Sequence, residues 1–230
     1  MIDQKSIAKY LDSTCVKPDA TQAEIKQLCA DAQKHTFHSV CITSYRVSDA
    51  KNALKNSENI EIICVIGFPD GDTTTEEKIN EGKIAIAEGA TEIDMVINIG
   101  AIKDGNFNYV KDEISQIAQA IAPVKLKVIL EIGYLTKEEL IHACQIVKEA
   151  GAAFVKTSTG FGPRVPTADD IKIMRETVGA DFGVKASGGI KDFAAAKAMI
   201  EAGANRIGTS HAMEIIGAKA ETNEQTISTE

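Results

Sequence analysis

Short apolar runs follow helical patterns at several places along the chain. Three stretches share one register: Glu-Gly89-Ala-Thr-Glu-Ile-Asp94, Ala-Gly151-Ala-Ala-Phe-Val-Lys156 and Ala-Gly203-Ala-Asn-Arg-Ile-Gly208. In each one, a segment rich in Ala, Ile, Lys and Glu stops at a glycine, the residue best suited to the left-handed backbone after a helix. A β-like run follows at once. The repeated unit is therefore predicted to be a helix, a tight loop and a strand.

Other apolar runs predict the remaining strands. They lie at residues 39–43, 60–67, 125–132 and 182–186, with a shorter candidate near 10–14. Candidate helices lie between them, and two open on a capping pattern in which a threonine precedes a carboxylate by three residues. These pairs are Thr136 with Glu139 and Thr167 with Asp170.

Near-continuous apolar strands joined by helices indicate a parallel sheet that is covered on both faces. About eight such strands close naturally into a TIM (β/α)8 barrel, here with a short N-terminal helix, so the fold class is α/β. The 230 residues suit one barrel domain at 1–216 and a polar tail at 217–230 that is predicted to be mobile. An open doubly wound sheet is the alternative, but no Gly-x-Gly-x-x-Gly follows the first strand.

The formal net charge of −8 argues against non-specific binding to nucleic acid or to an anionic membrane. The N-terminus shows no basic region followed by an apolar stretch, and no segment approaches about 18 uncharged apolar residues. We therefore expect a cytoplasmic protein. Its five cysteines are scattered and suit reduced core thiols better than a disulfide framework: Cys15, Cys29, Cys41, Cys64 and Cys144.

Two lysines carry the strongest chemical signal. Lys156 and Lys185 each lie in an apolar run that breaks into small hydroxylated residues and glycine. A buried ammonium loses its hydration unless it is paired or gives up its proton, and a second ammonium nearby favours the neutral amine, which is the nucleophile. Asp94 ends a β-like run and stands at the same distance from its repeat glycine as Lys156 does. In the alternative interpretation, one or both lysines extend into water at the barrel rim, and Asp94 is only a buried ion-pair partner.

The carboxyl-terminal ends of barrel strands form the active face. Five candidates are predicted to lie at such ends: Asp12, Cys41, Asp94, Lys156 and Lys185. Glycines follow the last two strands, where helix N-termini leave backbone N–H groups free for an anion and barrels commonly hold phosphate. The residues concerned are Gly188, Gly189, Gly208 and Ser210. The glycines could equally serve only as tight turns.

Three segments together resemble the deoxyribose-phosphate aldolase family: Glu-Ile-Asp94-Met-Val-Ile-Asn, Phe-Val-Lys156-Thr-Ser-Thr-Gly-Phe and Val-Lys185-Ala-Ser-Gly-Gly-Ile. The similarity runs from about Asp12 to Ile215. It implies a class I aldolase without metal or other cofactor that interconverts 2-deoxy-D-ribose 5-phosphate with acetaldehyde and D-glyceraldehyde 3-phosphate. By this resemblance, Lys156 forms the Schiff base, Lys185 favours its neutral form, and Asp94 relays protons.

The resemblance also implies the substrate contacts. Asp12 and Thr14 match positions near the substrate hydroxyl, and the phosphate site is matched by Gly160, Gly188, Gly189, Gly208 and Ser210. Cys41 is placed with the substrate-binding residues. The partners are then a sugar phosphate and aldehydes, with no nucleic acid or membrane, and a homo-oligomer is expected, with a dimer favoured.

Three features depart from the family pattern. Relatives often carry two serines after the last strand, whereas here Ser210 is followed by His211, so phosphate affinity could become pH-dependent. The segment Val-Cys41-Ile-Thr-Ser-Tyr replaces a frequent Val-Cys-Val-Asn-Pro pattern, which changes the expected loop shape but not the chemistry. Some relatives end in a tyrosine that assists proton transfer, and the tail to Glu230 contains none.

Three other functions stay open at this point. A metal-dependent aldolase is disfavoured because the histidines form no ligand spacing: His35, His38, His142 and His211. Another class I aldolase acting on a related phosphorylated aldehyde would share the lysine chemistry. A non-catalytic sugar-phosphate-binding barrel would not need both lysines and Asp94.

Overall fold

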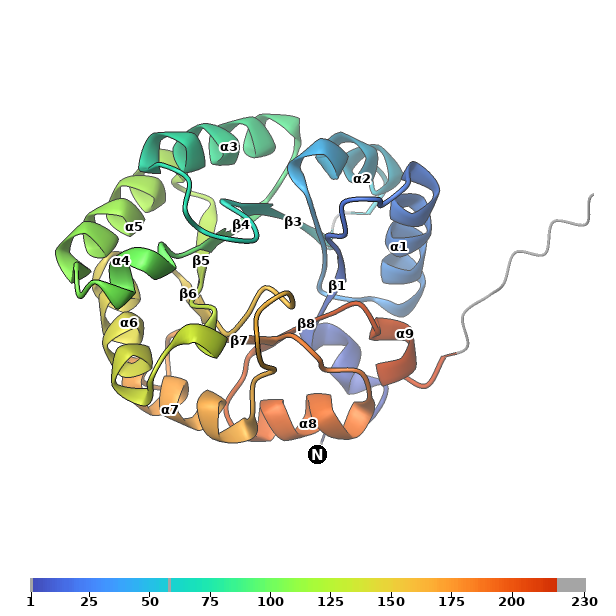
Figure 1. Cartoon of the computed structure of the whole chain (residues 1–230). Coiled ribbons are helices and arrows are strands. Elements are labelled where there is room, and N and C mark those ends of the chain that lie inside the picture. Colours follow the sequence, from blue (N-terminus) through green and yellow to red (C-terminus); the bar gives the residue numbers. More distant parts are fainter. Residues whose placement is uncertain (1, 58, 219–230) are drawn as a thin grey trace, which may run out of the picture.

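The chain folds into a closed parallel barrel ringed by helices (Figure 1). A computed structural model describes residues 2–57 and 59–218, and in these residues the strands follow sequence order around the barrel. Their bounds are β1 Leu11–Cys15, β2 Ser39–Ile42, β3 Glu61–Ile66, β4 Glu92–Val96, β5 Lys125–Ile129, β6 Phe154–Lys156, β7 Gly183–Ser187 and β8 Arg206–Thr209. The predicted TIM barrel is confirmed.

The strands are buried on both faces, as their apolar sequences require. Strands β2, β4 and β8 are buried at every position, because one face packs in the barrel interior and the other under the helices. The strand predicted at 125–132 is too long, since β5 ends at Ile129. The apolar run continues into a loop and a short 3-10 helix, η3, at Ile132–Tyr134.

Helices cover the outside of the barrel (Figure 1). Two 3-10 helices flank the first two strands: η1 at Ser6–Tyr10 precedes β1, and η2 at Ser44–Arg46 follows β2. The expected N-terminal helix is η1. The α-helices are α1 Gln22–His35, α2 Val47–Ala53, α3 Thr75–Glu88, α4 Ile99–Lys103, α5 Phe107–Ile121, α6 Lys137–Glu149, α7 Ala168–Val178, α8 Phe193–Glu201 and α9 Ala212–Ile215.

The capping pairs and glycines predicted from the sequence begin and end helices in the structure. Thr136 with Glu139 and Thr167 with Asp170 form capping boxes, which satisfy backbone N–H groups at the first turn. The three repeat glycines have positive φ angles of 122°, 85° and 117°, at Gly89, Gly151 and Gly203. A side chain would strain the backbone there, so these glycines allow the chain to leave each helix and enter the next strand.

The barrel elements end with α9, so the domain predicted at 1–216 contains all of them. Most of the tail predicted at 217–230 lies outside the described residues, which stop at 218. The five cysteines are free thiols, four of them buried and Cys15 partly buried. Within the described part of the chain, no helix has the length and apolar character needed to cross a membrane.

An ion pair outside the barrel joins α3 to α5. The Nζ of Lys78 lies 3.0 Å from Glu113 Oε2 and donates to the carbonyl oxygen of Gly71 at 2.8 Å. Both side chains are fully buried. Removing one member of such a pair leaves an unpaired buried charge, so the pair is expected to matter for stability and not for chemistry.

Lys78→Met should lower the free energy of unfolding by about 3 kcal/mol, because Glu113 would stay buried without its cation. Urea denaturation monitored by circular dichroism measures this loss. The double variant Lys78→Met/Glu113→Leu should recover part of it, since no charge is then left unpaired. A single variant as stable as wild type would contradict the assignment.

Candidate active site

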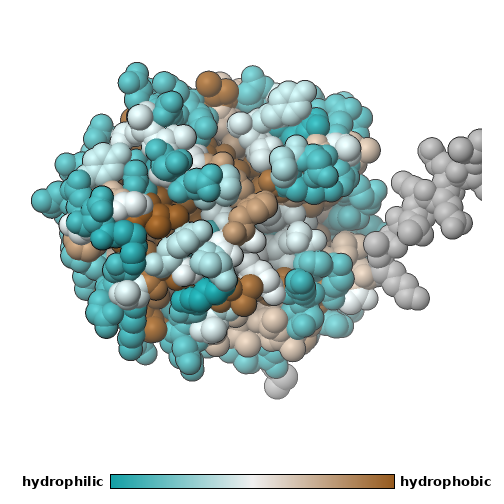
Figure 2. Space-filling view, viewed as in Figure 1, coloured by the Kyte–Doolittle hydropathy of each residue, from teal (hydrophilic) through white to brown (hydrophobic). Residues whose placement is uncertain are grey.

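A large cavity opens at the carboxyl-terminal end of the barrel. Its volume is about 990 Å³, and β1, β2, β3, β6, β7 and β8, or the loops that follow them, contribute to its wall. In Figure 2 hydrophobic residues gather in the hollow at the centre of this face, inside a largely hydrophilic rim. This is the face where barrel enzymes place their reactive groups.

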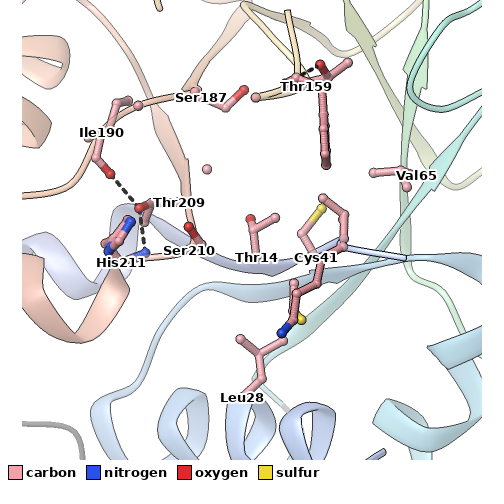
Figure 3. A pocket seen from close by; sticks show the side chains of 18 of the residues that line it. Thr14, Leu28, Cys41, Val65, Thr159, Ser187, Ile190, Thr209, Ser210 and His211 are labelled. Carbon is pink, nitrogen blue, oxygen red and sulfur yellow. Dashed lines mark hydrogen bonds between the residues drawn. The ribbon is translucent and has the colours of Figure 1, made fainter. Parts of the chain in front are cut away.

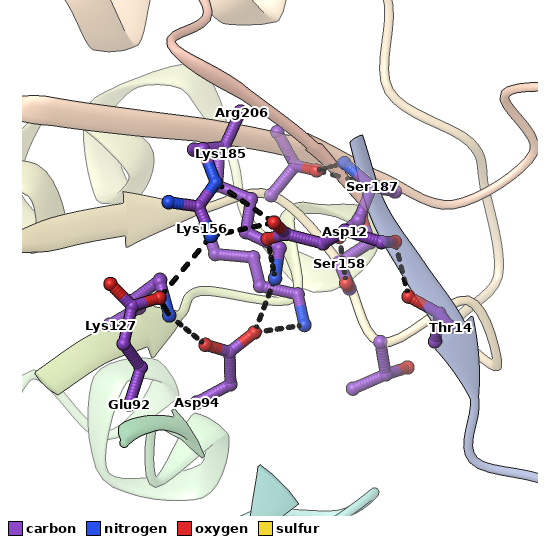
Figure 4. Close-up of polar contacts among 12 residues, drawn as sticks. Asp12, Thr14, Glu92, Asp94, Lys127, Lys156, Ser158, Lys185, Ser187 and Arg206 are labelled. Atoms are coloured by element: carbon purple, nitrogen blue, oxygen red, sulfur yellow. Dashed lines mark hydrogen bonds and ion pairs between the residues drawn. The ribbon is translucent and has the colours of Figure 1, made fainter. Parts of the chain in front are cut away.

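Lys156 lies at the inner end of this cavity as the last residue of β6. It is the neighbour of Lys185 across the β6–β7 pairing. Both ammonium groups converge on one carboxylate oxygen, because Asp94 Oδ2 lies 2.8 Å from Lys156 Nζ and 2.7 Å from Lys185 Nζ (Figure 4). The two lysines and the aspartate singled out from the sequence are therefore in direct contact.

A ring of alternating charges links Asp94 and Lys185 to other buried groups in the barrel interior (Figure 4). Lys127 Nζ lies 2.9 Å from Asp94 Oδ1 and 2.7 Å from Glu92 Oε2. Arg206 Nη2 lies 3.2 Å from Glu92 Oε2 and 2.6 Å from Asp12 Oδ1. Lys185 closes the ring at 2.6 Å from Asp12 Oδ2. All of these side chains are buried in the barrel interior.

The ring fixes the charges of Asp94 and Lys185. Burial alone would favour the neutral acid at Asp94, but Lys127, Lys156 and Lys185 outweigh it and hold the pKa of Asp94 well below its ordinary value. Burial likewise opposes the Lys185 ammonium, but Asp12 and Asp94 raise the pKa of Lys185 above its ordinary value. Asp94 is thus a stable anion and Lys185 a stable cation at neutral pH.

Counting the charges singles out Lys156. The buried cluster holds three carboxylates and four cations, and the exposed Lys125 is a further partner of Glu92 at 3.6 Å. Lys127, Lys185 and Arg206 each contact two carboxylates, whereas Lys156 contacts Asp94 alone. Lys156 is therefore the most weakly paired cation of the cluster, and it is the one lysine of the cluster that lines the cavity, where a substrate aldehyde can reach it.

The predicted site residues divide into two layers. Eight of them line the cavity, several visible in Figure 3: Thr14, Cys41, Lys156, Gly160, Gly188, Gly189, Gly208 and Ser210. Asp94, Lys185 and Asp12 lie in the charged layer beneath. These three residues were expected at strand ends, but Asp12 is the second residue of β1, and Asp94 and Lys185 are the middle residues of β4 and β7, so their side chains lie inside the barrel beneath the cavity. In β1, Thr14 is the one that reaches the cavity.

The glycine-rich end of the cavity is built on backbone angles that favour glycine. Gly160, Gly188 and Gly189 have φ angles of 96°, 99° and 70°, a region that favours glycine. The turn after β8 is braced by Thr209 Oγ1, which donates to the carbonyl oxygen of Ile190 at 2.7 Å and accepts from His211 N at 2.9 Å. His211 lines the cavity, while its Nδ1 lies 3.2 Å from Glu214 Oε1.

Sequence reasoning missed Glu92, Lys127 and Arg206. A signal was present, because strand side chains two positions apart point to the same face. Glu92 is two residues before Asp94 and therefore shares its inward face, and Lys127 pairs with Asp94 across β4 and β5. Arg206 pairs with Lys185 across β7 and β8. In the described part of the chain, no group of three or more His, Cys, Asp or Glu side chains is placed to hold a metal ion.

Comparison with known proteins places the chain among aldolases. Residues 6–218 match the DeoC/LacD family of aldolases. The deoxyribose-phosphate aldolase of Aciduliprofundum boonei is 50% identical over 217 residues, which are 94% of this chain and 97% of that protein. The structure of the aldolase QR15 superposes with a TM-score of 0.88 at 38% identity, covering 94% of this chain and 95% of that one. The deoxyribose phosphate aldolase from Aeropyrum pernix superposes with a TM-score of 0.86 at 28% identity, covering 93% of this chain and 91% of that one.

Fold and site together define a (β/α)8 barrel with a buried lysine and carboxylate centre. The chain belongs to the DeoC/LacD family of aldolases.

Proposed function

We propose that this protein cleaves 2-deoxy-D-ribose 5-phosphate reversibly to acetaldehyde and D-glyceraldehyde 3-phosphate through a Schiff base on Lys156. The observation that carries the proposal is the convergence of Lys156 and Lys185 on one oxygen of Asp94 at the inner end of the cavity. Relatives about half identical over nearly their whole length are named deoxyribose-phosphate aldolase, which supports the substrate.

The substrate binds with its phosphate at the glycine-rich end and its aldehyde at Lys156. The free amine attacks the aldehyde carbon, and loss of water forms a protonated imine. The Asp94 carboxylate then accepts the proton of the hydroxyl on C3, the bond between C2 and C3 breaks, and its electron pair moves toward the imine nitrogen. Glyceraldehyde 3-phosphate departs, and a neutral enamine stays on Lys156.

Asp94 transfers the protons of this reaction, and Lys185 supplies a fixed positive charge beside it. Asp94 is an anion in contact with the reacting nitrogen, so it stabilises the positive imine and can pass a proton to or from it. Protonation of the enamine at C2 and addition of water release acetaldehyde and regenerate the amine. Lys185 keeps its positive charge throughout, because Asp12 and Asp94 hold its proton.

A coupled assay tests the function. Glyceraldehyde 3-phosphate released from 2-deoxy-D-ribose 5-phosphate is followed by its NADH-dependent reduction with auxiliary enzymes. Turnover with this substrate is the expected result. Turnover only with another phosphorylated aldehyde would indicate a different class I aldolase, and binding without turnover would indicate a sugar-phosphate-binding barrel.

We also propose a homo-oligomer, with a dimer favoured. The Aeropyrum pernix relative is described as tetrameric, which supports self-association in the family without fixing its number of subunits here. Size-exclusion chromatography with light scattering measures the number of subunits, and a monomer at micromolar concentration would refute this proposal.

Lys185→Leu should move the pH profile of cleavage to higher pH and lower turnover at pH 7 by at least about tenfold. Without the fixed cation beside it, Lys156 keeps its proton more readily, since a nearby like charge disfavours a second ammonium. The initial rate measured between pH 6 and pH 10 reports the change. Lys185→Arg is the matched control, because it retains the charge, and it should keep the wild-type profile. An unchanged profile in the leucine variant would mean that the two amines do not interact.

A further inference from the structure

Glu131 is a buried residue with an unusual backbone. It lies between β5 and η3, only 2% exposed, with φ 48° and ψ 62° in the left-handed region. A residue other than glycine is strained there, and such residues persist only where their surroundings hold them. The flanking N–H groups do so, because Leu130 N donates to Lys156 O at 2.9 Å and Ile132 N donates to Thr157 O at 3.1 Å.

The Glu131 side chain holds the next loop of the barrel. Its Oε2 accepts from Thr159 N at 3.0 Å and also from the Thr159 hydroxyl. Thr159 Oγ1 in turn accepts from Phe161 N at 3.0 Å. The other oxygen, Oε1, is buried next to Gly162 and accepts no hydrogen bond from the described residues. Glu131 therefore holds Thr159 directly and Phe161 through the Thr159 hydroxyl, which fixes the backbone on both sides of Gly160.

The segment it holds has no regular structure of its own. Residues 157–166 connect β6 to α7, and Thr159, Gly160 and Phe161 line the cavity, with Thr159 visible in Figure 3. A Cβ added at Gly188 would lie 3.7 Å from Gly160 Cα, so the backbones of these two glycines are adjacent at the glycine-rich end. Glu131 does not line the large cavity.

We propose that Glu131 is a positioning residue that sets the phosphate end of the site and thereby the preference for phosphorylated over unphosphorylated substrate. Backbone N–H groups bind an anion well only when the backbone is held in place, since hydrogen bonds weaken steeply with distance and angle. The reactive lysines are fixed independently by strand pairing and the charge ring. Loosening the loop therefore affects phosphate binding and leaves the imine chemistry intact. This inference rests on the proposed function.

Glu131→Gln tests the inference, because it keeps the shape of the side chain and removes the charge that binds both Thr159 donors. The KM for 2-deoxy-D-ribose 5-phosphate should rise at least about tenfold, which corresponds to about 1.4 kcal/mol. The kcat for this substrate, and the kcat/KM for unphosphorylated 2-deoxy-D-ribose, should stay within about twofold. Glu131→Asp is the second variant, since it keeps the charge but moves the oxygens away from Thr159, and it should show the same split.

Glu113→Gln is the matched control. It also removes a buried glutamate charge, but on α5 outside the barrel and opposite Lys78. It should lower stability and leave the ratio of the two kcat/KM values unchanged. Parallel losses on both substrates in Glu131→Gln and Glu131→Asp would show that Glu131 only supports the fold and would overturn the inference.

Inorganic phosphate provides a test that needs no turnover. Phosphate that binds the folded state should raise the thermal midpoint of wild type and of Glu113→Gln. The rise should be lost in both Glu131 variants, and its persistence there would overturn the inference. Absence of aldol cleavage in wild type with a normal phosphate response would instead contradict the proposed function, so the two failures are distinguishable.

Discussion

Lys156→Met is expected to lower turnover of 2-deoxy-D-ribose 5-phosphate by at least about 1000-fold, because the side chain that forms the covalent intermediate is gone. The variant should fold, since Lys156 is the buried cation of the cluster that contacts only one carboxylate. Lys185 cannot replace the lost amine. It is fully buried and held as an ammonium between Asp12 and Asp94.

Covalent trapping locates the amine directly. Acetaldehyde with borohydride should leave a reduced adduct on Lys156 of the wild-type protein, identified by peptide mass spectrometry, and none at the corresponding peptide of Lys156→Met. Lys17→Met is the matched control, because Lys17 also lines the cavity but lies in a loop, half exposed and paired with Glu24. That variant should keep both turnover and adduct. An adduct on another lysine alone would refute the assignment.

Asp94→Asn is expected to reduce turnover by at least about 100-fold, which is the usual lower scale for loss of a general acid or base. The amide fills the same space but carries no charge and cannot exchange a proton with the reacting groups. Three buried cations lose a shared partner: Lys127, Lys156 and Lys185. The thermal midpoint should therefore fall as well, and turnover must be measured below the unfolding range.

Glu92→Gln separates these two effects. Glu92 belongs to the same ring and contacts Lys127 and Arg206, but it does not contact Lys156. Its removal should destabilise the barrel to a similar degree while turnover falls much less than in Asp94→Asn. Equal losses of turnover in the two variants would mean that Asp94 serves only as a counter-ion and takes no part in proton transfer.

Local features of this protein could be predicted from the sequence because they depend on residues close together in the chain. Capping at Thr136 and Thr167 needs a partner three residues away, and the turn at Gly89 needs only a positive φ. Both were predicted correctly. The strand of 125–132 was overestimated, since an apolar run does not reveal where strand pairing stops. Leu130 and Ile132 stay buried after β5 has ended.

The candidate site shows where sequence reasoning reaches its limit. Lys156, Lys185 and Asp94 stand out because a charge at the end of an apolar run is costly to bury. Glu92, Lys127 and Arg206 are buried charges as well, but they were passed over. Glu92 and Arg206 are the first residues of their strands, and Lys127 shares its strand with another lysine. Glu131 gave no signal at all, because its importance arises from a backbone angle and from contacts with Thr159, 28 residues away.

The sequence by itself determined the alternation of helices and strands, their caps and the residue types available for amine chemistry, since these follow from propensity and spacing along the chain. Only the tertiary structure decided which charges meet. Barrel closure brings Asp12 of β1 next to Arg206 of β8, 194 residues apart, and lets Asp94 reach three lysines on other strands. Ion pairing depends on distances of a few ångströms between side chains, and those distances exist only after the strands have closed into a ring.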